Sequence, residues 1–433
     1  MSGSSVDYDI VIAGGGMVGA SLALMLSQSV AGRRPLRILV VEAFPLPDST
    51  RQVIYRPSFD ARSTALSYGS RQILQQLAVW PQLAEHVSAI DRIHVSERGA
   101  PASTLLHASD YQWPALGYVL ENAWLGNVLL QHLGRREGVN FACPARISEA
   151  VASEGSVTMS LQQSDTEQSI SSRLLVVADG AQSGLREQLG ISAARQDYQQ
   201  SAVIANVCFQ KPHQNVAYER FTDEGPMALL PLADSDCGKP RAALVWTRTP
   251  GQAAVLCGCS EQAFLASLQQ RFGHRLGAFT RVGERGSYPL ALIEAEEQIR
   301  SHIVVMGNAA HSLHPVAGQG FNLALRDCAA LTQHILQSPL EALGTLPQLQ
   351  AYYQSQQLDQ LKTLRFSDQV GDFFASSNGL FKGLRQMGLA AMDSLPILRR
   401  SFVEQAAGMQ AGAPQVGLLQ ALLSPTLGVQ QHG

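Results

Sequence analysis

Three glycines near the amino terminus have the spacing of a phosphate-binding turn. Gly14, Gly16 and Gly19 form the pattern Gly-x-Gly-x-x-Gly between a β-branched run, 10–13, and a stretch of helical composition, 20–26. Glycines at these positions permit a tight turn, close approach to a pyrophosphate and close packing of helix on strand. The helix start adds N–H groups and a positive dipole end. The segment therefore predicts a nucleotide-binding site.

An acidic side chain follows the second strand of the same unit. After the turn-like segment 32–35, the apolar run 38–41 ends at Glu42. Strand, glycine turn, helix, strand and acid make one βαβ unit of the expected length. A carboxylate at this place can accept hydrogen bonds from a ribose diol. The unit alone does not distinguish NAD from FAD.

A second motif follows a later buried strand. The apolar run 174–178 leads into Asp179 and Gly180, and the motif continues to Arg186. Taken alone, this is a strand followed by an Asp-Gly turn. It becomes informative only together with the other two motifs.

The third motif, 307–327, follows the strand predicted over 303–306. Its loop is rich in proline, glycine and histidine, and Gly318 and Gly320 open the next helix. A helix start of this kind can present N–H groups to a negatively charged ring edge, which suits a reduced flavin. This motif therefore favours FAD.

The composition excludes several classes of protein. With 433 residues, the chain is long enough for two or three domains of about 150 residues each. Hydrophobic residues make up 45%, with 37 glycines and 20 prolines, which excludes disordered, collagenous and coiled-coil proteins. Charged residues are only 15%, which favours association with other proteins or an apolar interface. The net charge of −3, without a basic stripe, argues against nucleic-acid binding.

The six cysteines predict neither a disulfide framework nor a metal site. Cys257 and Cys259 form the only close pair, and no histidine accompanies them at zinc spacing. The first nine residues show no basic region or cleavage signal of a secretory peptide. We expect a cytoplasmic protein, with peripheral contact to the inner membrane left open.

The remaining pattern predicts an α/β protein assembled from separated segments. Residues 70–80 and 123–134 have helical composition, whereas 200–250 alternates and carries proline and glycine, which indicates a sheet. From residue 321 onward the chain is mostly helical in pattern. These elements predict a nucleotide-binding domain with a sheet domain inserted into it.

In this order and at these spacings, the three motifs resemble the FAD-dependent aromatic hydroxylases of the p-hydroxybenzoate hydroxylase type. Segments 59–66 and 314–323 are similar to the ubiquinone-biosynthesis branch of that family. The resemblance covers roughly residues 6–415 and is loose over 196–285, where substrate contacts would lie. One departure occurs at Asn308, where the family usually has an aspartate that contacts the ribityl chain. Because asparagine can still hydrogen-bond a hydroxyl, FAD binding should survive.

The resemblance implies a fold of class α/β (α+β overall): a Rossmann-like FAD-binding domain, an inserted β-sheet substrate domain and a helical C-terminal region. The expected division is 1–75, FAD-binding domain, first segment; 76–105, partly substrate domain; 106–195, FAD-binding domain, second segment; 196–285, β-sheet substrate domain; 286–370, FAD-binding domain, third segment with the flavin-ring loop; and 371–433, helical C-terminal region.

The resemblance also implies roles for individual residues. The expected FAD contacts are Gly14, Gly16 and Gly19 at the pyrophosphate, Glu42 at the adenosine ribose, Arg62 at the phosphates or ring, Asn122 at the pyrophosphate, and Asn308, Pro315, Gly318, Gly320 and Asn322 around the isoalloxazine. Gly307 is also expected to contact the cofactor. Asp179 is expected to serve FAD and NAD(P)H. For Arg62 a plain surface position, and for Asn122 a helix-capping role, stay open.

No residue is predicted to be catalytic. His311 and His314 lie in the third motif, where a histidine could act as a base, but the family's chemistry needs none there. Trp246, on the strand predicted over 242–247, could line the substrate pocket or lie in the core.

The implied function is an FAD-dependent aromatic-ring monooxygenase with NAD(P)H or another reductant. Oxygen would form a flavin C4a-hydroperoxide that hydroxylates a polyprenylated phenol in ubiquinone biosynthesis, most closely at C1 of a 2-polyprenyl-6-methoxyphenol. Two alternatives stay open: a sister hydroxylase acting at another ring position, and a non-catalytic FAD-binding scaffold of a biosynthetic complex. The intact glycines and Asp179 argue against the scaffold.

Overall fold

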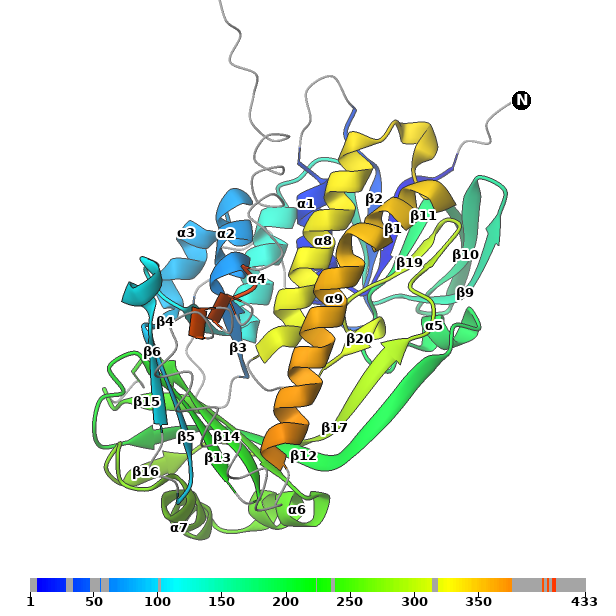
Figure 1. Cartoon of the computed structure of the whole chain (residues 1–433). Helices are drawn as coiled ribbons and strands as arrows, with labels where there is room; N and C mark the ends of the chain where they lie inside the picture. Colours follow the sequence, from blue (N-terminus) through cyan, green and yellow to red (C-terminus); the bar gives the residue numbers. More distant parts are fainter. Residues whose placement is uncertain are drawn as a thin grey trace, which may run out of the picture.

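The computed structural model describes most of the chain. The described residues are 6–28, 34–46, 55, 62–99, 103–222, 224–234, 238–313, 318–375, 399–400, 403–404 and 407–409. Within this part the chain forms three sheets, of eight, nine and three strands, with helices around them (Figure 1).

The eight-stranded sheet carries the glycine turn. Its main strands run in the order β18-β19-β11-β1-β2-β8, and β1 pairs in parallel with both β11 and β2. The strands are β1 (Tyr8–Ala13), β2 (Ile38–Val41), β8 (Val139–Ala142), β11 (Thr166–Val177), β18 (Ile299–Arg300) and β19 (Ile303–Val305), with the hairpin β9 (Arg146–Ser153) and β10 (Ser156–Gln163) paired to β11.

Both faces of this sheet are covered, which is why its central strands are continuously apolar. Ile10 and Ile12 of β1 belong to a core shared with the helices on one face, whereas Val11 belongs to a second core shared with β10. The helices of the first face are α1 (Met17–Leu26), α4 (Asn122–Leu133), α8 (Gln319–Gln337) and α9 (Leu346–Ala375) (Figure 1).

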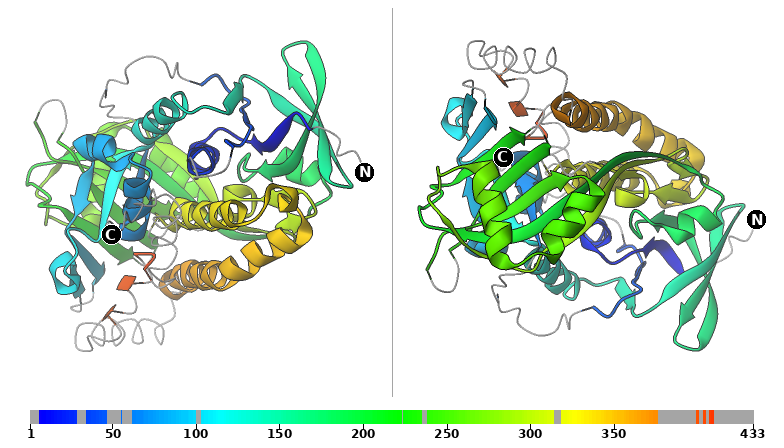
Figure 2. Two further views of the ribbon diagram at one scale, coloured as in Figure 1. Left: turned by 90° about the horizontal axis from the view of Figure 1, so that it is seen from above. Right: turned by 90° about the horizontal axis from the view of Figure 1, so that it is seen from below.

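The nine-stranded sheet runs in the order β20-β17-β12-β15-β14-β13-β5-β6, with β16 paired to β12. Its strands are β5 (Arg92–Glu97), β6 (Ser103–His107), β12 (Ala193–Phe209), β13 (Val216–Thr222), β14 (Gly225–Leu232), β15 (Arg241–Arg248), β16 (Phe279–Val282), β17 (Gly286–Ala295) and β20 (His311–Ser312). Helices α6 (Pro250–Gly258) and α7 (Glu261–Phe272) cover one face of this sheet (Figure 2).

The three-stranded sheet lies between the other two. It contains β3 (Ser63–Ser67), β7 (Gly117–Glu121) and β4 (Ser88–Ile90) in the order β3-β7-β4. Ile90 and Val119 of this sheet share a core with Ala217, Leu230 and Ala243 of the nine-stranded sheet. The nine-stranded sheet therefore turns one face toward α6 and α7 and its other face toward the domain that carries the glycine turn.

Short elements complete the described chain. They are α2 (Tyr68–Gln76), α3 (Trp80–Leu83), α5 (Gly184–Gln188) and the 3-10 turns η1 (Ala84–His86), η2 (Ala108–Tyr111), η3 (Gly307–Ala309) and η5 (Leu340–Ala342). Among the helices that the structure describes, none is long and apolar enough to cross a bilayer.

The predicted fold class is confirmed. The helices predicted over 70–80 and 123–134 correspond to α2 and α4, and the sheet predicted over 200–250 corresponds to β12–β15. The sequence did not predict α6 and α7, which fall inside the segment expected to be sheet. Strands β5, β6, β17 and β20 join the nine-stranded sheet from outside 196–285. Most of the predicted helical C-terminal region lies outside the described residues.

Candidate functional site

The glycine turn joins β1 to α1 and is closed by backbone on two sides. Gly14 has φ +108°, and a Cβ there would overlap the carbonyl oxygen of Ala178. A Cβ on Gly19 would overlap the carbonyl oxygen of Gly14. Around Gly16, by contrast, a Cβ would find no atom within 4 Å. The turn is thus tight where it packs on the protein and open at the first turn of α1, which fits an approaching pyrophosphate.

Glu42 follows β2 directly beside this turn. Its Oε2 accepts a hydrogen bond of 2.7 Å from the backbone N–H of Gly15, and its Oε1 accepts one of 2.9 Å from Phe44 N–H. These bonds fix the carboxylate next to the glycines and leave further lone pairs on both oxygens. The position fits the predicted ribose contact.

The second motif lies against the first. The N–H of Ala178 donates to the carbonyl oxygen of Ala13 at 2.8 Å, so β11 ends at the same edge of the sheet as β1. Asp179 follows there with an exposed side chain, whose Oδ2 accepts a 3.4 Å hydrogen bond from Leu185 N–H. The carboxyl ends of parallel strands form the usual ligand-binding edge of such sheets. Asp179 therefore lies beside the glycine turn at this edge, and its contact with FAD or NAD(P)H stays a prediction.

Arg186 ties the second motif to the third. Its guanidinium is buried and donates a 2.9 Å hydrogen bond to the carbonyl oxygen of Ala309, in the turn that begins the third motif. Gly307 in that turn has φ +59°, and a Cβ on it would stand 3.2 Å from the side chain of Val18 on α1. The three motifs thus form one connected unit. The sequence did not predict this role of Arg186.

Asn322 connects α8 to β3 through both ends of its amide. Its Oδ1 accepts hydrogen bonds from Ser67 N–H at 2.9 Å and the Ser70 hydroxyl at 2.7 Å. Its Nδ2 donates to the carbonyl oxygens of Ala65, at 2.9 Å, and Gly318, at 2.8 Å. Protein partners therefore use all four hydrogen-bonding capacities of this side chain. These bonds give Asn322 a positioning role at the start of α8, and its place beside the isoalloxazine stays a prediction.

Gly318 and Gly320 shape the start of α8. Gly318 caps the helix with φ +61°, and a Cβ on it would come within 3.2 Å of Ala65. Asn308 is exposed, and its Oδ1 lies 3.9 Å from the point that a Cβ on Gly320 would occupy. The side chain of Asn308 thus faces the helix start, as an amide that binds a ribityl hydroxyl should. Pro315, also predicted here, lies outside the described residues.

The histidines of the third motif gain no catalytic assignment. His311 is buried in β20, and burial lowers its pKa to about 4, a shift that nearby Gln360 partly offsets. At neutral pH its ring is uncharged and a weak base. His314 lies outside the described residues.

Arg62 and Asn122 meet at the edge of the three-stranded sheet. The backbone N–H of Asn122, the first residue of α4, donates to the carbonyl oxygen of Arg62 at 2.8 Å. The Thr64 hydroxyl donates to Asn122 Oδ1 at 2.5 Å. The guanidinium of Arg62 is 4.9 Å from the ring centroid of Tyr288 on β17, a cation–π contact. Arg62 therefore reaches from the FAD-binding side to the nine-stranded sheet.

A buried ion pair joins the same two regions. Arg241 Nη2 of β15 lies 3.0 Å from Glu121 Oε1 of β7, and the two side chains are only 3% and 4% exposed. The Tyr55 hydroxyl also donates to Glu121 Oε1, at 3.1 Å. Burial and the Glu121 carboxylate raise the pKa of Tyr55 to about 12. No sequence motif signals this pair, because its partners are 120 residues apart.

Trp246 lies in the core, one of the two positions that the sequence left open. It is 1% exposed and packs edge-on against Phe264 of α7, at 6.0 Å between ring centroids. It belongs to the face of the nine-stranded sheet covered by α6 and α7. It does not face the FAD-binding side.

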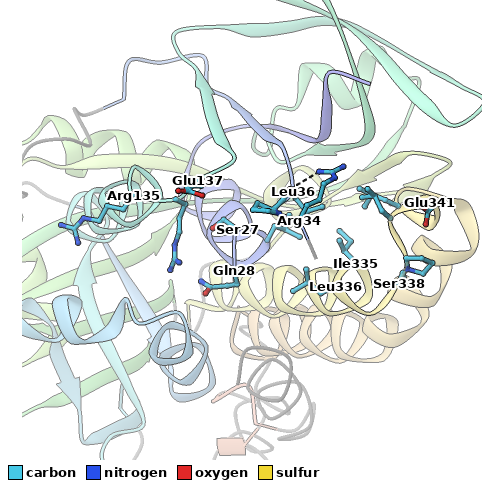
Figure 3. A pocket seen from close by; sticks show the side chains of 16 residues that line it. Ser27, Gln28, Arg34, Leu36, Arg135, Glu137, Ile335, Leu336, Ser338 and Glu341 are labelled. Atoms are coloured by element: carbon cyan, nitrogen blue, oxygen red, sulfur yellow. Dashed lines mark hydrogen bonds between the residues drawn. The ribbon is translucent and has the colours of Figure 1, made fainter. Parts of the chain in front are cut away.

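A cavity of about 440 Å³ lies near the start of β2, at the opposite end of the eight-stranded sheet from the glycine turn (Figure 3). It is formed where α1 and α8 end and where the chain enters β2, with Leu26, Leu36 and Ile335 in its lining. Arg34, also in the lining, forms an ion pair with buried Asp9 at 2.7 Å. None of the predicted site residues lines this cavity, so it is separate from the glycine turn.

Comparison with known proteins agrees with this geometry. The chain is 30% identical over 409 residues to ubiquinone hydroxylase UbiL of Rhodospirillum rubrum, covering 94% of this chain and 91% of the relative. It is 29% identical over 405 residues to 3-demethoxyubiquinol 3-hydroxylase of Escherichia coli, covering 93% and 98%. The crystal structure of p-nitrophenol 4-monooxygenase PnpA from Pseudomonas putida superimposes with a TM-score of 0.72 at 18% identity, covering 93% of this chain and 99% of that one.

The fold and the connected motifs define an FAD-dependent monooxygenase of the aromatic hydroxylase class. The model of the FAD binding domain family matches residues 7–356, and the chain belongs to that family.

Proposed function

We propose that this protein hydroxylates a polyprenylated phenol in ubiquinone biosynthesis. The reaction is the C1 hydroxylation of that pathway, at the ring carbon para to the hydroxyl of a 2-polyprenyl-6-methoxyphenol, as 2-octaprenyl-6-methoxyphenol hydroxylase performs. The observation that carries the proposal is the end-to-end similarity to two enzymes named as hydroxylases of ubiquinone or its precursor, each covering more than nine-tenths of this chain. The glycine turn, Glu42 and Asp179 at one sheet edge support FAD as the cofactor.

When bound, reduced FAD would activate oxygen for electrophilic attack on an electron-rich ring. The chain's own residues supply binding and orientation. Gly14, Gly16 and Gly19 would admit the pyrophosphate, and Glu42 would accept hydrogen bonds from the ribose hydroxyls. Asn308 would hydrogen-bond the ribityl chain, and Asn322 holds the start of α8 in place beside β3. One face of the nine-stranded sheet is turned toward this unit, and with substrate and cofactor bound it would exclude water from the reacting ring.

NAD(P)H is the proposed reductant. Asp179 is exposed at the sheet edge beside the glycine turn, so a dinucleotide can approach it without displacing a packed side chain. Stopped-flow reduction of the bound flavin by NADH and by NADPH tests this step. If neither NADH nor NADPH reduces the bound flavin, the enzyme requires a separate electron donor instead.

The pathway is tested by mass spectrometry of quinones and their precursors in cells of the source organism that lack this protein. Accumulation of 2-polyprenyl-6-methoxyphenol with loss of ubiquinone supports the proposal. Accumulation of a demethoxy precursor would instead assign the enzyme to another ring position, as the name of the Escherichia coli relative suggests. Normal ubiquinone would contradict the proposed pathway.

We further propose that the enzyme works at a membrane surface, within an assembly of biosynthetic enzymes, because its polyprenyl substrate resides in the bilayer. The low charged fraction of 15% favours such association. Liposome flotation and co-purification of the full chain, compared with a chain ending at residue 375, test this proposal. Equal behaviour of the two chains would exclude the tail as the docking element.

A further inference from the structure

One row of side chains is accessible in a sheet whose neighbouring positions are buried. In β15 all eight residues are buried except Val245. In the second half of β12, over 201–209, all residues are buried except Ile204. In β14 the partly exposed residues are Ala228 and Leu230. Water therefore reaches the sheet interior at a few defined positions.

These positions are register partners. Ile204 pairs with Val245, Val245 with Ala228, and Ala228 with Glu219 of β13. Beyond Ile204 the row continues to Gly286 of β17. Paired residues point to the same face of a sheet, so the row forms one continuous strip across five strands. At about 4.8 Å between strands, the strip is about 19 Å long.

The strip lies on the face that looks toward the FAD-binding domain. The residues that precede or follow it in each strand, such as Val203, Leu244 and Leu229, pack against α6 and α7 on the opposite face. Because side chains alternate along a strand, the strip points away from those helices. Its face also holds Ala217 and Ala243, which contact the three-stranded sheet.

The two ends of the strip differ chemically. At the β17 end, the Tyr288 ring lies over Gly286, where a Cβ would be 3.0 Å from it, and the guanidinium of Arg62 stacks on that ring. At the β13 end stands Glu219. Between them the floor is made of Ile204, Val245 and Ala228, which are small or β-branched and apolar.

Glu219 is the carboxyl group of the strip. It is half-buried, and no described residue forms a hydrogen bond or ion pair with its side chain. Its neighbour Arg220 points to the other face, where its Nε donates to the carbonyl oxygen of Arg271 at 3.2 Å. Burial raises the pKa of Glu219 to about 8. A carboxyl group without a protein partner, set at the end of a mostly apolar strip, is typical of a group kept for a ligand.

We propose that the strip is the floor of the phenol site and that Glu219 positions the substrate by accepting a hydrogen bond from its phenolic hydroxyl. The inference rests on the proposed function and deepens it, since it names the residue that selects which ring carbon faces the flavin. The apolar floor suits the ring and the first part of a prenyl tail. A ring held by its hydroxyl presents one fixed set of carbons to the oxidant, so Glu219 is a positioning residue.

The test compares a 2-prenyl-6-methoxyphenol with its methyl ether, which lacks the hydroxyl proton. Each compound is titrated into the oxidised holoenzyme, and its Kd is measured from the change in the flavin absorption spectrum. Wild type should bind the phenol about tenfold more tightly than the ether, the ratio expected for one hydrogen bond to a carboxyl group. In Glu219→Ala the two Kd values should become equal. Glu219→Gln, whose amide oxygen still accepts, should keep most of the discrimination.

Tyr218→Phe is the matched control, because it removes a hydroxyl from the same strand on the opposite face. It should keep the wild-type discrimination. Flavin content and thermal midpoint report whether each variant is folded. If Glu219→Ala folds and still prefers the phenol tenfold, or if wild type binds both compounds equally, the proposal is wrong.

Turnover separates this result from the fate of the proposed function. Under that function Glu219→Ala should also release more hydrogen peroxide per NAD(P)H oxidised, because a loosely held ring is hydroxylated less often. If wild type binds the phenol with discrimination but forms no hydroxylated product, the proposed function fails while the assignment of Glu219 stands.

Discussion

The ligand sites proposed at the glycine turn and on the nine-stranded sheet depend on different features of the chain. At the turn, binding depends on backbone geometry, so the essential residues are glycines at a fixed spacing within six positions of the chain. On the sheet, the inferred site depends on which side chains are left accessible in one row of paired strands. The comparison shows why a cofactor site can be found in a sequence while the substrate site next to it cannot.

The largest effect is expected at the glycine turn. Gly19→Ala should abolish FAD binding and lower the thermal midpoint of the apoprotein, because the new Cβ overlaps the Gly14 carbonyl oxygen. Flavin absorbance of the purified protein and its melting curve provide the measurement. A flavin-loaded, stable Gly19→Ala protein would show that the turn is not built as described.

Gly16→Ala is the matched control for that variant. Its Cβ meets no protein atom, so the apoprotein should melt within about 1 °C of wild type. Its affinity for FAD should nevertheless fall at least tenfold, because the space at Gly16 is kept for the pyrophosphate. Unchanged FAD affinity would place the phosphates elsewhere.

The next largest effect is expected where the three-stranded sheet meets the nine-stranded sheet, at the ion pair of Glu121 and Arg241. Arg241→Ala leaves the Glu121 carboxylate buried without its cation and should cost about 3–5 kcal/mol of unfolding free energy. Urea unfolding measures this loss. The double variant Glu121→Leu, Arg241→Met removes both charges and should recover most of it. Equal losses in the single and double variants would mean that the ion pair is not what couples the regions.

A smaller effect is expected at Asn322. Asn322→Ala removes four hydrogen bonds and leaves two carbonyl oxygens and two donors unpaired, which should cost about 2–3 kcal/mol. Asn322→Asp keeps the acceptor but loses both donated bonds, and should fall between wild type and alanine. The ranking is checked by denaturant unfolding of the holoenzyme. An Asn322→Ala protein with the unfolding free energy of wild type would contradict the positioning role.

The smallest expected effect is a change of protein stability with pH that arises from Glu219 on the nine-stranded sheet. The pKa of Glu219 is raised in the folded protein to about 8, so ionisation opposes folding and stability falls as pH rises from about 4.5 to 8. Glu219→Gln removes this term and should gain about 1–2 kcal/mol over wild type at pH 8.5 and nothing at pH 4.5. Melting curves across this pH range test the sign. A constant difference would mean that the carboxyl group is not the titrating group.

Much of the FAD side could be predicted from the sequence because its determinants are local. The β1–α1–β2 unit is visible as an apolar run, a glycine pattern and a terminal acid within 42 residues. The structure places Glu42 beside the turn, as the spacing predicts, and Asp179 lies there too, whereas the FAD contacts of both stay predictions. Asn322 lies in the first turn of α8, and its hydrogen bonds to β3 and Ser70 could not be predicted because they depend on where β3 lies.

The remainder could not be predicted because it depends on pairing between distant segments. Arg241 meets Glu121, and Arg62 meets Tyr288, only after the sheets assemble. Glu219 occupies the opposite face of β13 from its neighbours Tyr218 and Arg220, and a register shift of one residue would turn it to the other face. Helices α6 and α7 were missed because the segment before them is strongly strand-like.

We propose that the FAD side with its glycine turn and the nine-stranded sheet together place an oxygen atom on a prenylated phenol. The most direct test incubates the purified holoenzyme with NADPH, 2-polyprenyl-6-methoxyphenol and ¹⁸O₂, followed by mass spectrometry of the quinol product. We predict a product that carries one ¹⁸O atom at the carbon para to the phenolic hydroxyl, the group that the site holds. Glu219→Ala should form less of this product. NADPH oxidation that yields only labelled hydrogen peroxide, with the phenol unchanged, would contradict the account.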